Sequence, residues 1–97
     1  MLLEAVAGIE GKRMLSTILY IGMNSGCTKG QLYDAVSRNI RMPEMLRELE
    51  SRGILRINVG SDGHSEKLSL TSLGKKVFVL LKQCAELLIS ESSYVDQ

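Results

Sequence analysis

The clearest pattern in the chain is an alternation of apolar and polar residues on both sides of a polar turn. The apolar positions are Leu55, Ile57 and Val59 before the turn, and Leu68 and Leu70 after it. This period of two predicts a pair of half-buried β-strands. Asp62-Gly63 lies between them and favours a two-residue type I′ turn, in which both central residues have positive φ. That turn places Ile57 opposite Leu68 and Leu55 opposite Leu70, so turn chemistry and alternation predict the same register.

Ahead of this hairpin, apolar residues recur at helical spacing. Residues 12–24 predict a first core helix that ends near Asn24-Ser25-Gly26, where Asn or Gly can adopt the left-handed conformation that stops a helix. Its expected inward residues are Leu15, Ile18, Leu19 and Gly22, with Met14, Ile21 and Met23 widening the face. Residues 1–9 predict a further helical turn or two.

Two more helices are predicted between the first core helix and the hairpin. Thr28 and Gln31 have the spacing of a capping box, and the short helix that they open is expected to bury Leu32, Ala35 and Val36. A third helix is predicted over residues 39–52 and ends at Gly53; its buried stripe is Met42, Met45, Leu46 and Leu49. Its start stays open, because Asn39 is the better cap by residue type, whereas Pro43 suits the first helical position.

After the hairpin, residues 71–91 predict a long helix with Thr71 as its N-cap. One apolar stripe has alternating spacings of three and four and consists of Leu70, Leu73, Val77, Leu80, Cys84 and Leu87. A second stripe beside it consists of Phe78, Leu81, Ala85 and Leu88. One stripe suffices to pack the helix on its own domain, and an excess of exposed apolar surface usually marks an interface. We therefore expect a homodimer, with an interface that contains Val77, Leu80, Leu81, Cys84, Leu87 and Leu88. The alternative is that residues 1–9 cover the second stripe within one chain.

This order of elements predicts one α+β, mostly α domain over residues 1–97. Two helices joined by about three residues and followed by a hairpin form a winged helix-turn-helix. Residues 12–70 would be the helix-turn-helix and its two-stranded wing, residues 71–91 the C-terminal helix for dimerisation, and residues 92–97 a frayed tail.

Composition and charge restrict the function only loosely. The 97 residues carry a net charge of +1, but residues 12–56 contain eight basic and four acidic residues. A moderately basic region of this kind is compatible with DNA binding. The chain has no long apolar run and no signal-peptide pattern, and its two cysteines lack paired spacing. We expect a cytoplasmic protein with reduced thiols, without membrane contact, metal or cofactor. No catalytic constellation is visible, so an enzyme is not expected.

Candidate DNA contacts gather at the start of the third predicted helix. In a helix-turn-helix this end of the second helix enters the major groove, where Arg side chains can bind guanine and Ser or Asn can reach bases or phosphates. The candidates there are Ser37, Arg38, Asn39 and Arg41, joined by Lys29 and Gln31 from the preceding helix and by Arg56 and Lys67 from the wing. The alternative is that Arg41 pairs with Glu44 or Glu48 on a solvated helix face.

Two short segments carry a resemblance to a known group of proteins. Leu-Glu-Ser-Arg-Gly-Ile-Leu at 49–55 and, after the wing, Leu-Thr-Ser-Leu-Gly-Lys at 70–75 are similar to motifs of small archaeal and bacterial winged-helix transcriptional regulators. The chain looks most like stand-alone archaeal regulators, with the MarR-like group more distant. The resemblance covers roughly residues 12–90, and it implies a recognition helix over 39–52 and a wing over 54–70.

Two functions follow from these features. The leading hypothesis is a dimeric, sequence-specific, double-stranded DNA-binding transcriptional regulator that reads the major groove with helix 39–52. The alternative is a winged-helix protein–protein interaction module without DNA binding. The discriminating feature is whether Asp34, Glu44 and Glu48 cancel the arginines near residues 37–41.

Overall fold

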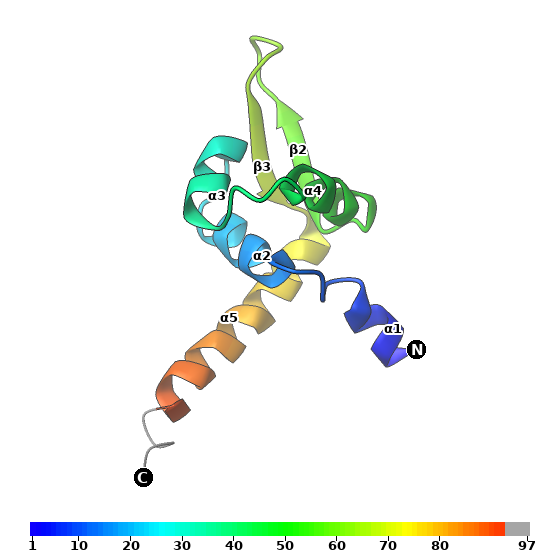
Figure 1. The fold of residues 1–97 in the computed structure, drawn as a ribbon, viewed down its shortest axis with the longest axis vertical. Helices are drawn as coiled ribbons and strands as arrows, with labels where there is room; N and C mark the ends of the chain where they lie inside the picture. The colour runs from blue at the N-terminus through cyan, green and yellow to red at the C-terminus, as the bar shows by residue number, and fades with distance from the viewer. Residues whose placement is uncertain (93–97) are drawn as a thin grey trace.

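The computed structural model describes residues 1–92 and has principal extents of 55 × 32 × 26 Å. Its elements are α1 (Leu2–Ala7), α2 (Met14–Met23), β1 (Cys27–Thr28), α3 (Lys29–Ala35), α4 (Met42–Ser51), β2 (Leu55–Val59), β3 (Glu66–Leu70) and α5 (Ser72–Ser92). The wing rises from one end of the helical domain and α5 runs out at the other (Figure 1). The architecture is thus the predicted one, mostly helical with a β-hairpin wing. Ser92 still belongs to α5, and the rest of the predicted frayed tail, 93–97, lies outside the described residues.

The sheet has three antiparallel strands in the order β1-β3-β2, instead of the two predicted. The register of the hairpin is confirmed, because Leu55 pairs with Leu70 and Ile57 with Leu68. The additional strand β1 pairs Cys27 with Leu68 on the other side of β3. The helix stop near Gly26 is also confirmed: this glycine has φ +87, and its N–H donates to the Leu68 carbonyl at 2.8 Å.

The turn of the wing differs from the predicted type I′ form. Gly63 has φ +77, but Asp62 does not adopt positive φ. Instead, the Asp62 carboxylate accepts from the backbone N–H groups of His64 and Ser65, both at 2.9 Å, and from the Ser65 hydroxyl at 2.5 Å. These bonds, led by the one from the Ser65 hydroxyl, lower the pKa of Asp62 to about 2. The Gly60 N–H donates to the Ser65 carbonyl at 2.6 Å, so this wider loop closes the same register.

The core lies between α2, α3, α4 and the inner face of the sheet. Its most buried members include Ile18, Ile21, Leu32, Leu46, Leu49, Leu55 and Leu68. The predicted stripe of α4 is confirmed in full. On α2 the prediction was partly wrong: Leu15 is 42% and Met23 63% exposed, while Thr17 is buried. Ala35 of α3 is exposed as well. Apolar residues surround much of α2, so periodicity alone could not select the face that packs against α5 and β3.

Thr17 presents the one buried side-chain hydroxyl without a hydrogen-bond partner in the described part of the chain. A buried hydroxyl without a partner costs about 1–3 kcal/mol. We therefore expect Thr17→Val to raise the free energy of unfolding by about 1 kcal/mol or more. Urea unfolding followed by circular dichroism measures the change.

Thr71→Val is the matched control for Thr17→Val because the chemical change is the same. The Thr71 hydroxyl accepts from the Gly74 N–H at 3.0 Å and caps α5 as predicted. This variant should lose about 1 kcal/mol. Two changes of the same sign would contradict the assignment of Thr17 as an unsatisfied group.

Helix α4 begins at Met42, three residues after the predicted start at Asn39. Pro43 explains the difference, because it has no N–H with which to reach the Asn39 carbonyl four residues earlier. The Met42 N–H bonds that carbonyl instead, at 3.0 Å. The alternative start near Pro43 was closer to the structure. The C-terminal stop is as predicted, since Gly53 has φ +77.

Helix α5 leaves much of its apolar surface uncovered. Val77, Phe78 and Leu81 are half-buried against the core of their own domain. In contrast, Leu80 is 63%, Leu87 58% and Leu88 70% exposed. The N-terminal segment does not cover them, because Leu2 and Leu3 are themselves 83% exposed and α1 lies beside a different part of the domain (Figure 1). The alternative to the predicted dimer, in which residues 1–9 cover the second stripe within one chain, therefore does not hold for the described residues.

Both cysteines are free, as predicted. Cys27 is buried, and burial raises the pKa of its thiol. Cys84, which belongs to the predicted dimer interface, is exposed on α5 of the single chain. Within residues 1–92, no helix is both long and apolar enough to cross a lipid bilayer.

Candidate nucleic-acid interface

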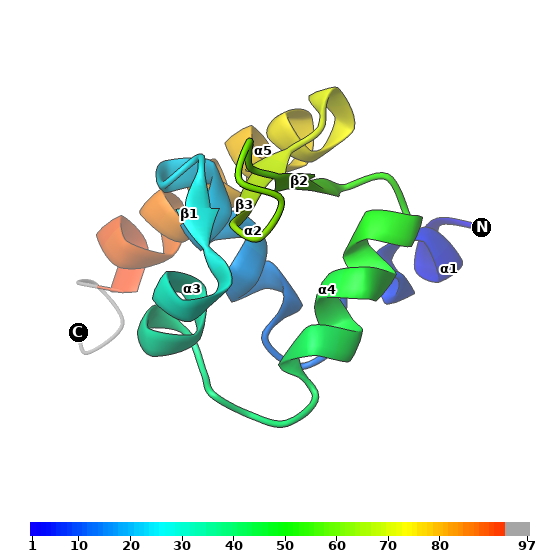
Figure 2. The ribbon, with the colours of Figure 1, turned by 90° about the horizontal axis from the view of Figure 1, so that it is seen from above.

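Helices α3 and α4 lie beside the base of the wing, and their connection runs along the edge of the domain farthest from α5 (Figure 2). This connection consists of residues 36–41 and is longer than the predicted three. It carries four of the predicted contact residues. The structure therefore brings Ser37, Arg38, Asn39 and Arg41 together on one exposed edge of the helix-turn-helix.

The connection is held in shape by its own short polar side chains. The Ser37 hydroxyl accepts from the Asn39 N–H at 3.2 Å, and the Asn39 carboxamide oxygen accepts from the Arg41 N–H at 2.8 Å. Such bonds to the nearby backbone stabilise turns. The side chains of Ser37 and Asn39 thus fix the backbone at Asn39 and Arg41.

The acidic side chains neutralise the arginines of this face only in part. Asp34 pairs with Arg38, and Glu48 pairs with Arg52 at 3.1 Å. Arg41 is exposed and forms no ion pair within residues 1–92, so the predicted alternative pairing with Glu44 or Glu48 is absent there. The guanidinium of Arg41 is therefore available to a ligand without breaking an ion pair.

The four remaining candidates fall into two groups. Arg56 and Lys67 are exposed on neighbouring strands of the wing. Lys29 instead bonds Glu66 at 3.2 Å and ties α3 to β3. Gln31 completes the predicted capping box, because its side-chain oxygen accepts from the Thr28 N–H at 2.9 Å. Lys29 and Gln31 thus have structural partners, whereas Arg56 and Lys67 are accessible.

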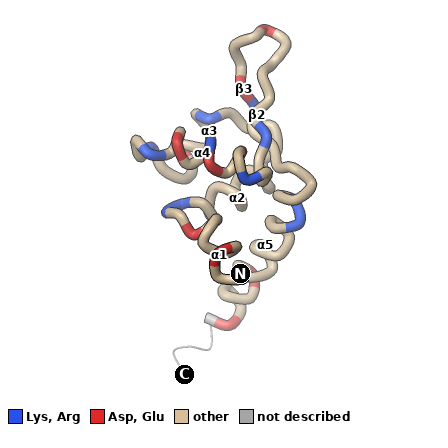
Figure 3. Tube along the Cα trace, turned by 90° about the vertical axis from the view of Figure 1, so that its right-hand side faces the viewer, with Lys and Arg blue, Asp and Glu red and all other residues tan. Residues whose placement is uncertain are grey.

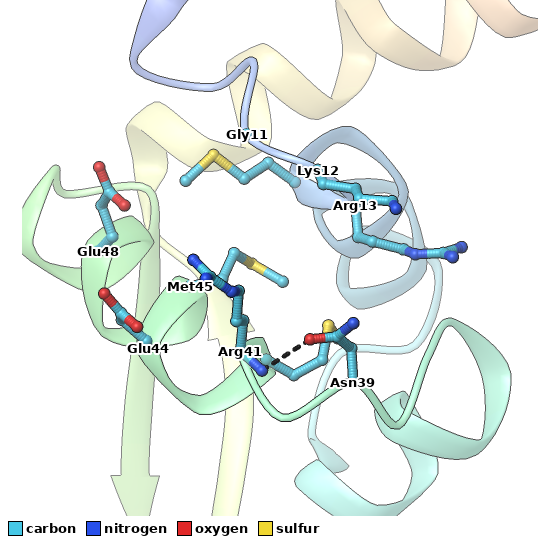
Figure 4. Close-up of a pocket in the computed structure, with 10 residues that line it drawn as sticks. Gly11, Lys12, Arg13, Asn39, Arg41, Glu44, Met45 and Glu48 are labelled. Carbon is cyan, nitrogen blue, oxygen red and sulfur yellow. Dashed lines mark hydrogen bonds between the residues drawn. The ribbon is translucent and has the colours of Figure 1, made fainter.

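A pocket next to Arg41 is lined by two basic residues, Lys12 and Arg13, that were not among the predicted contact residues. It has a volume of about 260 Å³ and lies between residues 11–14 and the first turns of α4 (Figure 4). Lys12 and Arg13 lie on one side of it, and Glu44 and Glu48 on the other. The dibasic pair was visible in the sequence, but only the tertiary structure brings the segment before α2 to the same pocket as the first turns of α4.

The charges of this surface do not form one continuous basic patch. Figure 3 shows basic and acidic positions interspersed along α3 and α4, and an acidic position at the tip of the wing. The tip residue is Asp62, a carboxylate that is ionised at neutral pH and whose pKa is lowered further, to about 2, by its hydrogen bonds to Ser65 and His64. Any attraction for phosphate must therefore come from the base of the wing and from the edge around Arg41.

Several solved structures share this arrangement at low sequence identity. FabT of Streptococcus pneumoniae, crystallised with DNA, is 20% identical with a TM-score of 0.72 over 93% of this chain and 68% of FabT. A MepR variant from Staphylococcus aureus is 20% identical, with a TM-score of 0.69 over 89% of this chain and 64% of MepR. The repressor CouR, bound to a 23-mer DNA duplex, is 19% identical, with a TM-score of 0.65 over 98% of this chain and 81% of CouR.

The chain thus spans about two thirds of the length of MepR and FabT. No family model matches it, and neither does any curated protein sequence. The similar structures are winged-helix transcription regulators of the MarR group, and those with a stated source are bacterial, so the expected archaeal affinity gains no support. The fold of this chain is the winged helix of those regulators.

Proposed function

We propose that this chain is a sequence-specific, double-stranded DNA-binding transcription regulator. The observation that carries the proposal is Arg41, which precedes α4, forms no ion pair within residues 1–92 and lies on the edge that a helix-turn-helix presents to the major groove. Arginine binds the O6 and N7 atoms of guanine with two hydrogen bonds. Lys12 and Arg13, across the pocket from α4, would add phosphate contacts nearby.

The proposed regulator acts as a homodimer. The support is the exposed apolar surface of α5, chiefly Leu80, Leu87 and Leu88, together with the exposed Leu2 and Leu3 of α1. Apolar surface of this extent is usually covered by a partner, and a two-fold dimer is the commonest solution. Two α4 helices would then read two half-sites about one helical turn apart.

Arginine substitutions at two positions separate base reading from phosphate binding. Arg41→Ala should weaken binding to the preferred duplex by about 1–3 kcal/mol and have a smaller effect on a scrambled duplex. Arg56→Ala should weaken binding to both duplexes about equally and reduce the salt dependence by about one counterion. Fluorescence anisotropy across a salt series measures both effects.

Lys82→Ala is the charge-matched control, because Lys82 is exposed on α5, away from the proposed contact surface. It should bind like the wild type on both duplexes. Negligible losses for both arginine variants would argue against the assigned surface. The absence of any binding at low salt would refute DNA binding altogether.

A protein–protein interaction module is the second candidate. Its support is the pairing of Asp34 with Arg38 and of Glu48 with Arg52, which lowers the positive charge of the helix-turn-helix face. This second function would be favoured if the protein does not bind DNA at low salt but binds a defined protein partner through this face.

A further inference from the structure

Ile40 is an apolar residue in an unexpected place. Its side chain is 91% exposed, more than any other large apolar side chain except that of Met1 in the described part of the chain. Single exposed apolar residues are common on protein surfaces, so exposure alone says little. The position is informative, because Ile40 lies between Asn39 and Arg41 in the connection just before α4. It is therefore separate from the apolar surface on α1 and α5 that the proposed dimer would cover.

The backbone on both sides of Ile40 is fixed by hydrogen bonds. The side chain of Asn39 accepts from the Arg41 N–H at 2.8 Å, and its carbonyl accepts from the Met42 N–H at 3.0 Å. Ile40 thus occupies the outer corner of a closed turn. A β-branched side chain also has few rotamers. The turn consequently presents a rigid apolar group to the outside, and little conformational entropy is lost when that group makes a contact.

We infer that Ile40 contacts the C5-methyl group of a thymine in the major groove. This methyl group is the apolar feature that base edges offer there. The residues around Ile40 are polar or charged, and a single isoleucine among them is too small a patch to hold a protein partner. A single methyl contact, in contrast, needs no more area than Ile40 offers. The inference rests on the proposed function and adds a base preference to it: Arg41 binds guanine and Ile40 selects a thymine close to it.

Replacing single thymines by uracil tests this contact, because uracil lacks the methyl group and keeps the base-pairing groups. The wild type and Ile40→Ala first select their preferred duplexes from a random-sequence pool. Each thymine of the wild-type duplex is then replaced in turn, and affinity is measured by fluorescence anisotropy. For at least one thymine, replacement should weaken wild-type binding by about threefold to tenfold. The same replacement should leave the affinity of Ile40→Ala unchanged.

The control variant is Met23→Ala, because Met23 is 63% exposed at the end of α2, outside the α3–α4 connection. It should retain the wild-type sensitivity to uracil. If no thymine is sensitive, or if wild type and Ile40→Ala are equally sensitive at every thymine, the contact is refuted while DNA binding stands. If the unmodified duplexes do not bind at all, the proposed function fails together with the inference.

Discussion

Gly74→Ala should lower the free energy of unfolding of the domain by about 3 kcal/mol or more. Gly74 is buried in the first turn of α5. A Cβ atom added there would clash with the Ile54 carbonyl oxygen, well below 3.0 Å away, and would lie 3.2 Å from the Leu70 Cβ. The obstacle at Ile54 is backbone, which cannot rotate away like a flexible side chain. The same carbonyl accepts from the Thr71 N–H at 3.1 Å, so its displacement would break the junction between α5 and the sheet.

Urea unfolding followed by circular dichroism measures this loss, and Gly30→Ala is the matched control. The nearest atom to a Cβ at Gly30 would be the Thr28 hydroxyl oxygen at 3.8 Å, so alanine fits there. Because alanine favours helix over glycine, this variant should gain up to about 1 kcal/mol. Similar unfolding midpoints for Gly74→Ala and the wild type would contradict the close approach of α5 to Ile54.

Leu80→Glu combined with Leu87→Glu should convert the proposed dimer into a folded monomer with far weaker DNA binding. The side chains of Leu80 and Leu87 are 63% and 58% exposed in the single chain. The two introduced carboxylates should therefore disturb the core of the domain little. In a dimer they would place unpaired carboxylates in an apolar interface, which is unfavourable. Loss of the second half-site contact should lower operator affinity by about 100-fold or more.

Sedimentation velocity reports the oligomeric state of this variant, and anisotropy reports its affinity for the operator. Lys82→Glu is the control, because it changes the net charge by the same −2 at an exposed position of α5 that has no i, i+3 or i+4 relation to Leu80 or Leu87. It should remain dimeric and bind normally. A wild-type chain that is monomeric at the concentrations where it binds its operator tightly would refute the role of the dimer.

Local sequence patterns predicted most of the elements and several of their ends. The strand register followed from the alternation around the wing, and the caps at Thr28 and Thr71 followed from residues three positions apart. The buried stripe of α4 followed from helical spacing. Each of these features depends on residues close together in the chain, whose geometry the period of a strand or helix already determines.

The candidate site was predictable only as a set of residues. The sequence identified the cluster from Ser37 to Arg41, but it could not decide which arginines would be free. That depended on local geometry: Arg38 reaches Asp34 one turn earlier, whereas Arg41 precedes the first residue of α4 and forms no ion pair within residues 1–92. The exposure of Ile40 was likewise unpredictable, because an apolar residue in a short loop can point inward or outward.

By itself, then, the sequence determined the winged helix, with the order of its helices and hairpin strands, the register of the hairpin and the helix caps at Thr28 and Thr71. The tertiary structure decided which faces meet. It buried Thr17 in place of Leu15, added β1 to the sheet, placed Lys12 and Arg13 across from α4, and left the outer surface of α5 uncovered. The physical reason is range: periodicity and capping act over a few residues, whereas these outcomes depend on the relative rotation and approach of elements far apart in the chain.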